Sequence, residues 1–183
     1  MSEKKYTADT KEEVLRQADR LFGEKGFHNT SMSEIAEAVD IQKPSLYYFF
    51  DSKESIYFTV VDRIMEQTIS LFHQASTEQP REDLAQIIEE CLNKGLQAGF
   101  IMSDIRDLIK IDDSKRKTEI KRKFAEMKKE IADHLDKLSV SDPQFAAQVL
   151  IDCLQMYLLR QKCGERQMPV REFAANLANI LCK

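Results

Sequence analysis

The sequence contains no tryptophan and few of the residues that interrupt regular secondary structure, with five glycines and four prolines in 183 residues. A β-sandwich or barrel needs a turn about every 8–12 residues, so this scarcity argues against both folds. Apolar residues make up 43% of the chain and recur at intervals of three and four, which is the spacing of amphipathic helices. The expected fold class is all-α.

Membrane, export and catalytic signals are also lacking. No stretch approaches the roughly 18 uncharged apolar residues of a membrane span, and residues 1–7 show no apolar signal region. The sequence has no Gly-rich phosphate loop, no nucleophile motif and no metal-ligand spacing. We therefore expect a cytoplasmic protein that has no membrane partner, is not an enzyme and takes no cofactor or metal.

The cysteines show no paired spacing. None forms a CxxC motif, so neither a zinc site nor a disulfide framework is indicated. We interpret them as reduced, mostly buried thiols: Cys91, Cys153, Cys163 and Cys182. The alternative, a thiol redox sensor, requires an electropositive exposed site that a sequence does not reveal.

Three helices are predicted in the N-terminal part of the chain, over about 9–25, 31–39 and 43–49. Gly26 ends the first as a C′ glycine, and Ser31 with Glu34 forms a capping box for the second. Pro44 suits the first turn of the third, where proline is tolerated. Two short helices joined by a tight turn, after a longer one, make a helix-turn-helix.

Further helices are expected over residues 52–72, 81–101, 103–112, 114–137, 143–163 and 170–182, which gives about nine in all. The polar stretch 74–80 separates the fourth helix from those that follow it. The basic run 115–129 alternates with apolar residues at helical intervals, so it is interpreted as the solvated face of an amphipathic helix.

A helix-turn-helix reads DNA with its second helix in the major groove, while neighbouring groups contact phosphates. On the third predicted helix the spacing turns Leu46 and Phe50 inward, so its other residues face outward. We predict DNA contacts from Lys43, Ser45, Tyr47 and Tyr48, with phosphate anchors at Thr30, Ser31 and Lys53. The structural alternatives are a Tyr47 packed on the fourth helix, a surface Lys53 and two purely capping hydroxyls.

Net charge does not support DNA binding by itself. The chain carries −4, and its first 60 residues hold eight basic against eleven acidic side chains. The prediction must depend on where the cations and tyrosines stand. A helical interaction module that has lost DNA binding is therefore a second reading.

An ordered set of motifs resembles the N-terminal signature of the TetR family of bacterial transcriptional regulators. These motifs are Gly26-Phe27, Thr30-Ser31, Ile35-Ala36, the stretch 46–50 and Ser52-Lys53-Glu54. The resemblance implies a helix-turn-helix DNA-binding domain over 1–53 and a helical ligand-binding and dimerisation domain over 54–183. Asp40, Gln42 and Pro44 depart from the family pattern around the turn, and they bear on the operator sequence more than on the fold.

Candidate residues in the C-terminal domain come from its apolar patterns. For a ligand pocket we single out Phe72, Cys91, Phe100, Met102, Ile105, Phe124, Met127, Met156 and Tyr157, although such residues at helical spacing more often form ordinary core. For a dimer interface we single out Val149, Leu150, Cys153, Leu154, Leu158, Phe173, Leu177 and Leu181.

The function that follows as an expectation is a homodimeric repressor of a palindromic operator in double-stranded DNA. A small apolar or amphipathic effector bound in the C-terminal domain would relieve the repression. The alternative is a DNA-binding dimer of the same fold without small-molecule input, controlled by a protein partner or by abundance.

Overall fold

The computed structural model describes residues 8–75, 78–98 and 114–182, and every regular element within these ranges is a helix. The helices are α1 (Ala8–Lys25), α2 (Met32–Ala38), α3 (Lys43–Phe49), α4 (Lys53–Gln74), α5 (Pro80–Ala98), α7 (Ser114–Lys137), α8 (Pro143–Lys162) and α9 (Val170–Leu181). The all-α prediction is confirmed, with helix ends close to those expected. The predicted helix over 103–112 lies outside the described residues.

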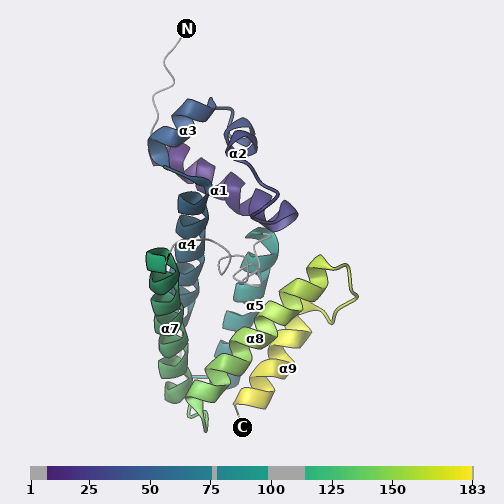
Figure 1. Cartoon of the computed structure of the whole chain (residues 1–183). Coiled ribbons are helices and arrows are strands. Elements are labelled where there is room, and N and C mark those ends of the chain that lie inside the picture. The colour runs from purple at the N-terminus through teal and green to yellow at the C-terminus, as the bar shows by residue number, and fades with distance from the viewer. Residues whose placement is uncertain (1–7, 76–77, 99–113, 183) are drawn as a thin grey trace.

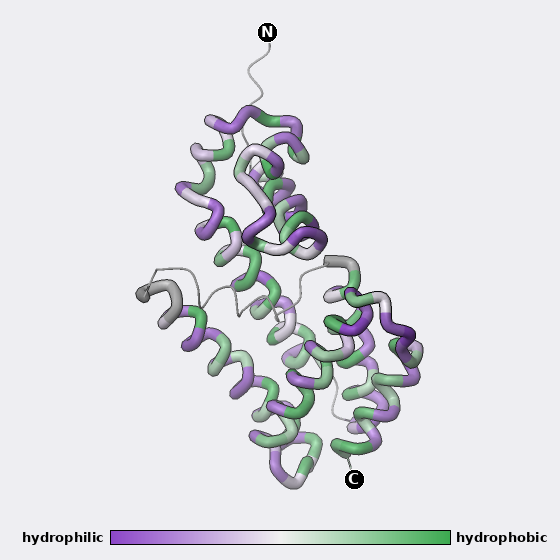
Figure 2. The backbone as a smooth tube through the Cα atoms, turned by 45° about the vertical axis from the view of Figure 1, so that its right-hand side comes forward, coloured by the Kyte–Doolittle hydropathy of each residue, from purple (hydrophilic) through white to green (hydrophobic). Residues whose placement is uncertain are grey.

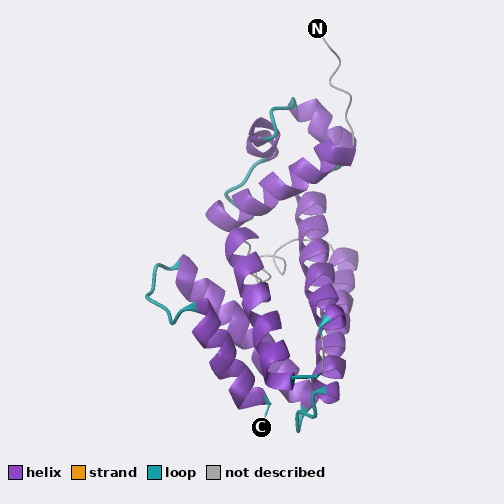
Figure 3. Ribbon diagram, turned by 180° about the vertical axis from the view of Figure 1, so that it is seen from behind, coloured by secondary structure: helices purple, strands orange, loops and turns teal. Residues whose placement is uncertain are grey.

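The helices form two tiers, which Figure 1 shows one above the other. We call α1–α3 the head and α4–α9 the body. Helix α4 runs from beneath the head along the body, where it packs against α7, while α5 packs against α9. Figure 3 shows the helices from behind; α8 packs against both α7 and α5, while α9 packs against α5.

Local sequence signals fix the turns of the head. Ser31 and Glu34 form the predicted capping box, with Glu34 N–H donating to Ser31 Oγ at 3.2 Å and Ser31 N–H donating to Glu34 Oε2 at 2.8 Å. Gly26 adopts φ +82° after α1, as a C′ glycine does. Asp40 stands at φ +55° in the turn before α3, a left-handed conformation that aspartate tolerates better than most residues.

The head is closed beneath by an aromatic cluster that includes the start of α4. Tyr57 of α4 is fully buried, with its ring centroid 5.2 Å from that of Phe22 and 4.8 Å from that of Phe27. The predicted domain boundary after residue 53 passes through this cluster. We therefore propose that the DNA-binding unit includes the first turns of α4.

The body helices bury one face each. Figure 2 shows apolar and polar residues alternating along them, the pattern of amphipathic helices. On α5 the buried face includes Leu84, Ile87, Ile88 and Leu92. None of the described helices has the length and apolar character needed to cross a membrane.

The cysteines do not form one class. Cys182 is buried and Cys91 and Cys153 are half-buried, but Cys163 is exposed, so the prediction of mostly buried thiols is wrong for it. Cys163 directly follows α8, where the chain turns away from the core. Burial raises the pKa of Cys91 to about 12, so that thiol stays protonated at neutral pH.

Candidate nucleic-acid interface and ligand cavity

Helix α3 is anchored on one side and open on the other. Leu46 within the helix and Phe50 directly after it are buried, as the spacing predicted. Tyr48 is 77% exposed and Tyr47 46% exposed, and Lys43 is also exposed at the start of the helix. Large exposed aromatics are unusual on a surface that stays in water, and their hydroxyls suit hydrogen bonding to phosphates or base edges.

The first turn of α3 is held by backbone hydrogen bonds and not by a side-chain cap. Gln42 is the N-cap residue but its side chain makes no capping hydrogen bond, and Pro44 occupies the first turn. The Gln42 carbonyl accepts instead from the N–H groups of Ser45 and Leu46, at 2.9 Å and 3.3 Å. Ser45 is half-buried, so of the four predicted α3 contacts it is the least presented to a partner.

The structure gives Thr30 a role inside the head. Its side chain is buried, and its hydroxyl lies 3.0 Å from the Gly26 carbonyl and 3.3 Å from the Leu21 carbonyl. This geometry differs from the predicted phosphate anchor, because the hydroxyl holds the α1–α2 connection. Ser31 next to it is exposed, and a hydroxyl that accepts a capping bond can still donate one.

Lys53 also turns inward. Its Nζ donates to the carbonyls of Phe27 and Thr30, both at 2.7 Å, and lies 4.3 Å from the centroid of the Phe27 ring. Burial lowers the pKa of Lys53 from its ordinary value. The residue therefore ties the start of α4 to the α1–α2 connection, which neither the phosphate-anchor prediction nor the surface-lysine alternative foresaw.

Several acidic groups of the head have cationic partners. Lys25 Nζ lies 2.6 Å from Glu34 Oε1, and this hydrogen bond together with those from Ser31 lowers the pKa of Glu34 to about 2. Arg20 and Glu24 form an ion pair at 2.9 Å along α1. These two carboxylates are thus held in ion pairs on α1 and α2, while the net charge of the head stays the same.

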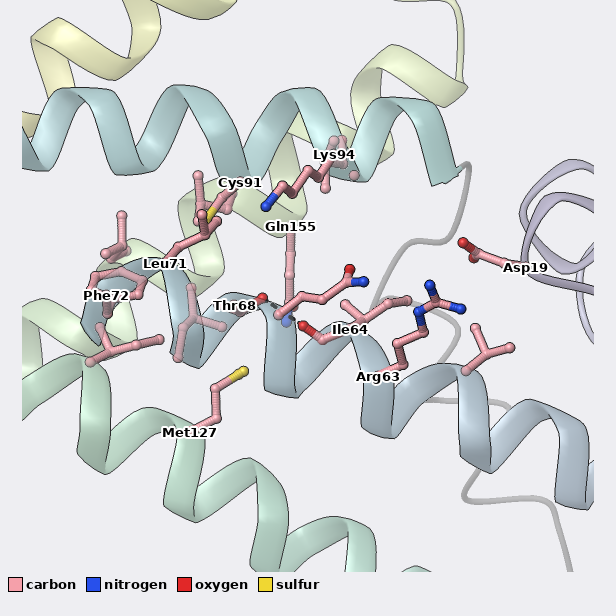
Figure 4. Close-up of a pocket in the computed structure, with 18 of the residues that line it drawn as sticks. Asp19, Arg63, Ile64, Thr68, Leu71, Phe72, Cys91, Lys94, Met127 and Gln155 are labelled. Atoms are coloured by element: carbon pink, nitrogen blue, oxygen red, sulfur yellow. Dashed lines mark hydrogen bonds between the residues drawn. The ribbon is translucent and has the colours of Figure 1, made fainter. Parts of the chain in front are cut away.

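A cavity of about 230 Å³ lies where α1, α4, α5, α7 and α8 meet (Figure 4). Its apolar part is lined by Leu71, Phe72, Cys91, Met127 and Ile131. Its polar part is lined by Arg16, Asp19, Arg63, Gln67, Lys94 and Gln155. The space therefore suits a small amphipathic molecule.

Asp19, on α1 of the head, contributes a buried carboxyl to the polar part of the cavity. Its Oδ1 is inaccessible to water and has no hydrogen-bond partner among the described residues. Burial raises the pKa of this carboxyl to about 7, against an opposing effect of the Arg63 guanidinium. Arg63 itself pairs with Glu12.

Comparison with known proteins bears first on the head. The family model described as bacterial regulatory proteins of the tetR family matches residues 14–60. Over this segment, about a quarter of the chain, the protein is similar to the tetR family. The match includes α2, α3, most of α1 and the first turns of α4, and thus the aromatic cluster around Tyr57.

A curated relative matches a segment of the chain. The Staphylococcus aureus (strain Newman) protein named "Biofilm operon icaADBC HTH-type negative transcriptional regulator IcaR" is 51% identical over 47 residues. Those residues are 26% of this chain and 25% of the relative, so the likeness concerns about a quarter of each protein.

Solved structures share the fold over most of the chain. A tetR-family transcriptional regulator from Streptomyces coelicolor superposes with a TM-score of 0.76 at 16% identity, over 96% of this chain and 80% of that one. Salmonella enterica GusR does so with a TM-score of 0.72 at 18% identity, over 99% of both chains. At this identity the likeness shows the fold alone.

The predicted ligand-pocket residues fall into three groups according to their place in the structure. Phe72, Cys91 and Met127 line the cavity. Phe124, Met156 and Tyr157 do not, and Phe100, Met102 and Ile105 lie outside the described residues. Met156 is 54% exposed on the outer side of α8, and Phe124 is half-buried outside the cavity lining.

Tyr157 serves the packing of α9 instead of the cavity. Its side chain is buried, its hydroxyl donates to the Met168 carbonyl at 2.6 Å, and its ring centroid lies 4.6 Å from that of Phe173. These contacts fasten the connection between α8 and α9. Its assignment to the ligand pocket is therefore corrected.

The predicted dimer-interface residues also divide. Leu150, Leu154 and Leu158 line the cavity, and Leu177 is buried within the protomer, so these four have packing roles inside the protomer. Val149, Cys153, Phe173 and Leu181 are half-buried. The prediction missed Phe145 and Ile180, which are 66% and 65% exposed. Helix α8 carries apolar residues on two faces, and periodicity alone does not tell which face the protomer buries.

Proposed function

We propose that the protein is a transcriptional repressor that binds double-stranded DNA as a homodimer and releases it when a small amphipathic molecule occupies the cavity. The observation that carries the DNA-binding part is the exposure of Lys43, Tyr47 and Tyr48 on a helix whose opposite side is locked into the head. The repressor part is supported by the similarity over 47 residues to IcaR, whose name gives it as a negative transcriptional regulator.

DNA binding through α3 is proposed to combine charge and hydrogen bonds. In a helix-turn-helix the second helix enters the major groove with its N-terminal residues towards the bases. Lys43 stands at that end of α3, and Tyr47 and Tyr48 follow one turn later. Each lysine–phosphate contact releases a counterion, which makes the affinity depend on salt.

The first experiment tests this surface by fluorescence anisotropy with DNA from upstream of the protein's own gene, over a series of salt concentrations. Lys43→Ala is expected to weaken binding about 3- to 10-fold and to reduce the salt slope by about 1. Lys137→Ala is the matched control, because Lys137 is exposed at the end of α7 remote from the head.

The control is expected to leave affinity and salt slope unchanged. Equal effects of both variants would contradict the assignment of α3 as the contact surface. If the upstream DNA is not bound, selection from random sequences follows, and failure there would remove the DNA-binding proposal altogether.

Dimerisation is proposed to use the outer face of α8 and α9. Phe145, Val149 and Met156 recur at helical spacing along α8, and Ile180 stands exposed on α9. Two such helices from each protomer can form a two-fold four-helix contact. A dimer would place two α3 helices for half-sites about one turn of DNA apart.

Met156→Asp is expected to weaken the dimer at least about tenfold, because it puts an unpaired charge in a desolvated contact. Sedimentation velocity over a range of concentrations measures the change. Leu96→Asp makes a similar substitution at another exposed apolar position, on α5, and should leave the dimer intact. A monomeric wild type, or equal effects of both variants, would contradict the proposed interface.

Control by a ligand requires different affinities for the two states of the protein. A molecule in the cavity shifts DNA binding only if it favours one arrangement of head and body over the other. The cavity wall contains residues of both tiers, Leu15 and Asp19 from α1 and Ile64 and Thr68 from α4 among them. If no ligand changes the affinity for the operator, control by a protein partner or by abundance is favoured instead.

A further inference from the structure

We propose that the ligand is a compact amphipathic amine, whose ammonium group binds the Asp19 carboxylate of the head while its hydrocarbon part lies against Phe72 and Met127 of the body. This inference rests on the ligand-binding part of the proposed function and names the class of molecule. It also makes the DNA-binding head itself part of the ligand site.

The first support is the unmet hydrogen-bonding capacity of Asp19. A buried carboxylate oxygen is ordinarily hydrogen-bonded, and leaving it without a donor costs free energy. Asp19 Oδ1 is buried at the cavity wall and has no partner among the described residues. Figure 4 shows the side chain at the α1 end of the cavity, on the side that faces α4. A ligand that brings an N–H donor would supply the missing bond.

The second support is the charge around this carboxyl. Three cations line the cavity: Arg16 on α1, Arg63 on α4 and Lys94 on α5. Arg16 is held by Glu13 at 2.6 Å and Arg63 by Glu12, so the protein already balances both. Lys94 extends towards Cys91 and Thr68, away from Asp19 (Figure 4). Asp19 is therefore the charged group at the head end that forms no ion pair among the described residues, although the more distant Arg63 guanidinium still acts on it.

The third support is the size and lining of the rest of the cavity. An engineered apolar cavity of about 150 Å³ binds benzene. The volume here is about 230 Å³, and the walls beyond the polar end are Leu71, Phe72, Met127 and Ile131. An aromatic ring with a short alkyl chain fits these dimensions, and the chain would carry the ammonium group towards α1.

Such a ligand would connect the two tiers directly. Its charged end would contact α1, which belongs to the head, and its apolar end would contact α4 and α7 of the body. Occupancy would hold the head at the spacing from the body that satisfies both ends. The coupling would thus act on the head through α1 as well as through α4.

Three probes with the same hydrocarbon test the inference: 4-phenylbutylamine, 4-phenylbutanol and 4-phenylbutyrate. Their binding to the intact protein is measured by isothermal titration calorimetry at pH 6 and pH 8. The amine is expected to bind about tenfold more tightly at pH 8, because burial raises the pKa of Asp19 to about 7 and the ammonium requires the ionised carboxylate. The alcohol should show no such dependence.

Two variants separate Asp19 from the other charges. Asp19→Asn keeps the shape of the side chain and is expected to abolish the pH dependence and to weaken amine binding about tenfold at pH 8. Its thermal unfolding shows independently that it is folded. Lys94→Gln removes the cation at the other part of the cavity and should leave amine binding unchanged or slightly tighter.

Tighter binding of the butyrate, weakened by Lys94→Gln, would overturn the inference in favour of an anionic ligand. Absence of binding by all three probes, or equal amine binding by wild type and Asp19→Asn, would overturn it as well. The anisotropy assay reads DNA binding without any probe. Tight DNA binding together with failure of the amine would therefore contradict this inference alone and leave the DNA-binding proposal standing.

Discussion

Replacing Tyr57 with alanine is expected to lower the free energy of unfolding by about 3–5 kcal/mol, the range for removing a large aromatic side chain from a core. Tyr57 is fully buried, and its ring contacts both Phe22 and Phe27 beneath the head. Neither phenylalanine can fill the space, since each is fixed by its own helix or turn. DNA binding should be lost in parallel, because α3 depends on this core for its position.

Tyr48→Ala is the matched comparison and should show the opposite pair of effects. Its side chain is 77% exposed, so stability should change by no more than about 0.5 kcal/mol. Operator affinity should fall about tenfold if the ring and hydroxyl contact DNA. Urea denaturation and fluorescence anisotropy measure the two quantities. A destabilised Tyr48→Ala, or a Tyr57→Ala that binds DNA normally, would contradict the division between core and contact surface.

The head was predictable because its signals are local. A capping box involves residues three apart, as Ser31 and Glu34 are, and a C′ glycine or first-turn proline acts at its own position. The inward positions of Leu46 and Phe50 follow from helical spacing within a single short helix. Such features do not depend on how distant parts of the chain pack.

The errors concern residues whose environment is set by distant parts of the chain. Lys53 binds carbonyls that lie 26 and 23 positions earlier, and no spacing rule signals such a bond. Leu154 and Met156 are both apolar and two residues apart on α8, yet one lines the cavity and the other is exposed. Which face of α8 turns inward depends on α4, α5 and α7 together.

Asp19 is another residue whose environment is set by distant parts of the chain. For this reason the sequence did not predict the polar end of the cavity. In the sequence it is one acidic residue among several on α1, where a charged side chain is most often solvated. Only the packing of α1 against α4 and α5 removes its Oδ1 from water. Burial of an unpaired carboxyl is a cost to folding, and such costs are concentrated at functional sites.

The free-energy cost of burying the Asp19 carboxyl leads to the second large predicted effect, a stability that depends on pH. The pKa of Asp19 is raised from 3.8 to about 7 on folding, so the folded protein binds more protons than the unfolded chain between those values. Stability from this group is therefore lost as the pH rises through that window. From pH 5 to pH 8 the loss amounts to about 2–3 kcal/mol, at 1.36 kcal/mol for each unit.

Asp19→Asn removes the titrating group while keeping the shape of the side chain. The stability difference between the variant and the wild type should therefore increase in favour of the variant by about 2–3 kcal/mol from pH 5 to pH 8. This corresponds to roughly 4–10 °C in Tm. Thermal and urea unfolding of both proteins at both pH values measure this difference. The other titrating groups are the same in the two proteins, so their contributions cancel. Asp136→Asn, at an exposed carboxylate near the end of α7, should show the same stability difference from wild type at both values.

If the stability difference between Asp19→Asn and the wild type does not change with pH, the charge of this carboxyl is already balanced inside the apo protein. In that case Arg63, which now pairs with Glu12, would have to be its partner, and the cavity would offer no free charge to an amine. A difference that grows with pH and disappears when 4-phenylbutylamine is bound would show the reverse. The ammonium would then be supplying the counterion that α1 lacks, and the stability lost by burying Asp19 would be recovered only in the liganded protein.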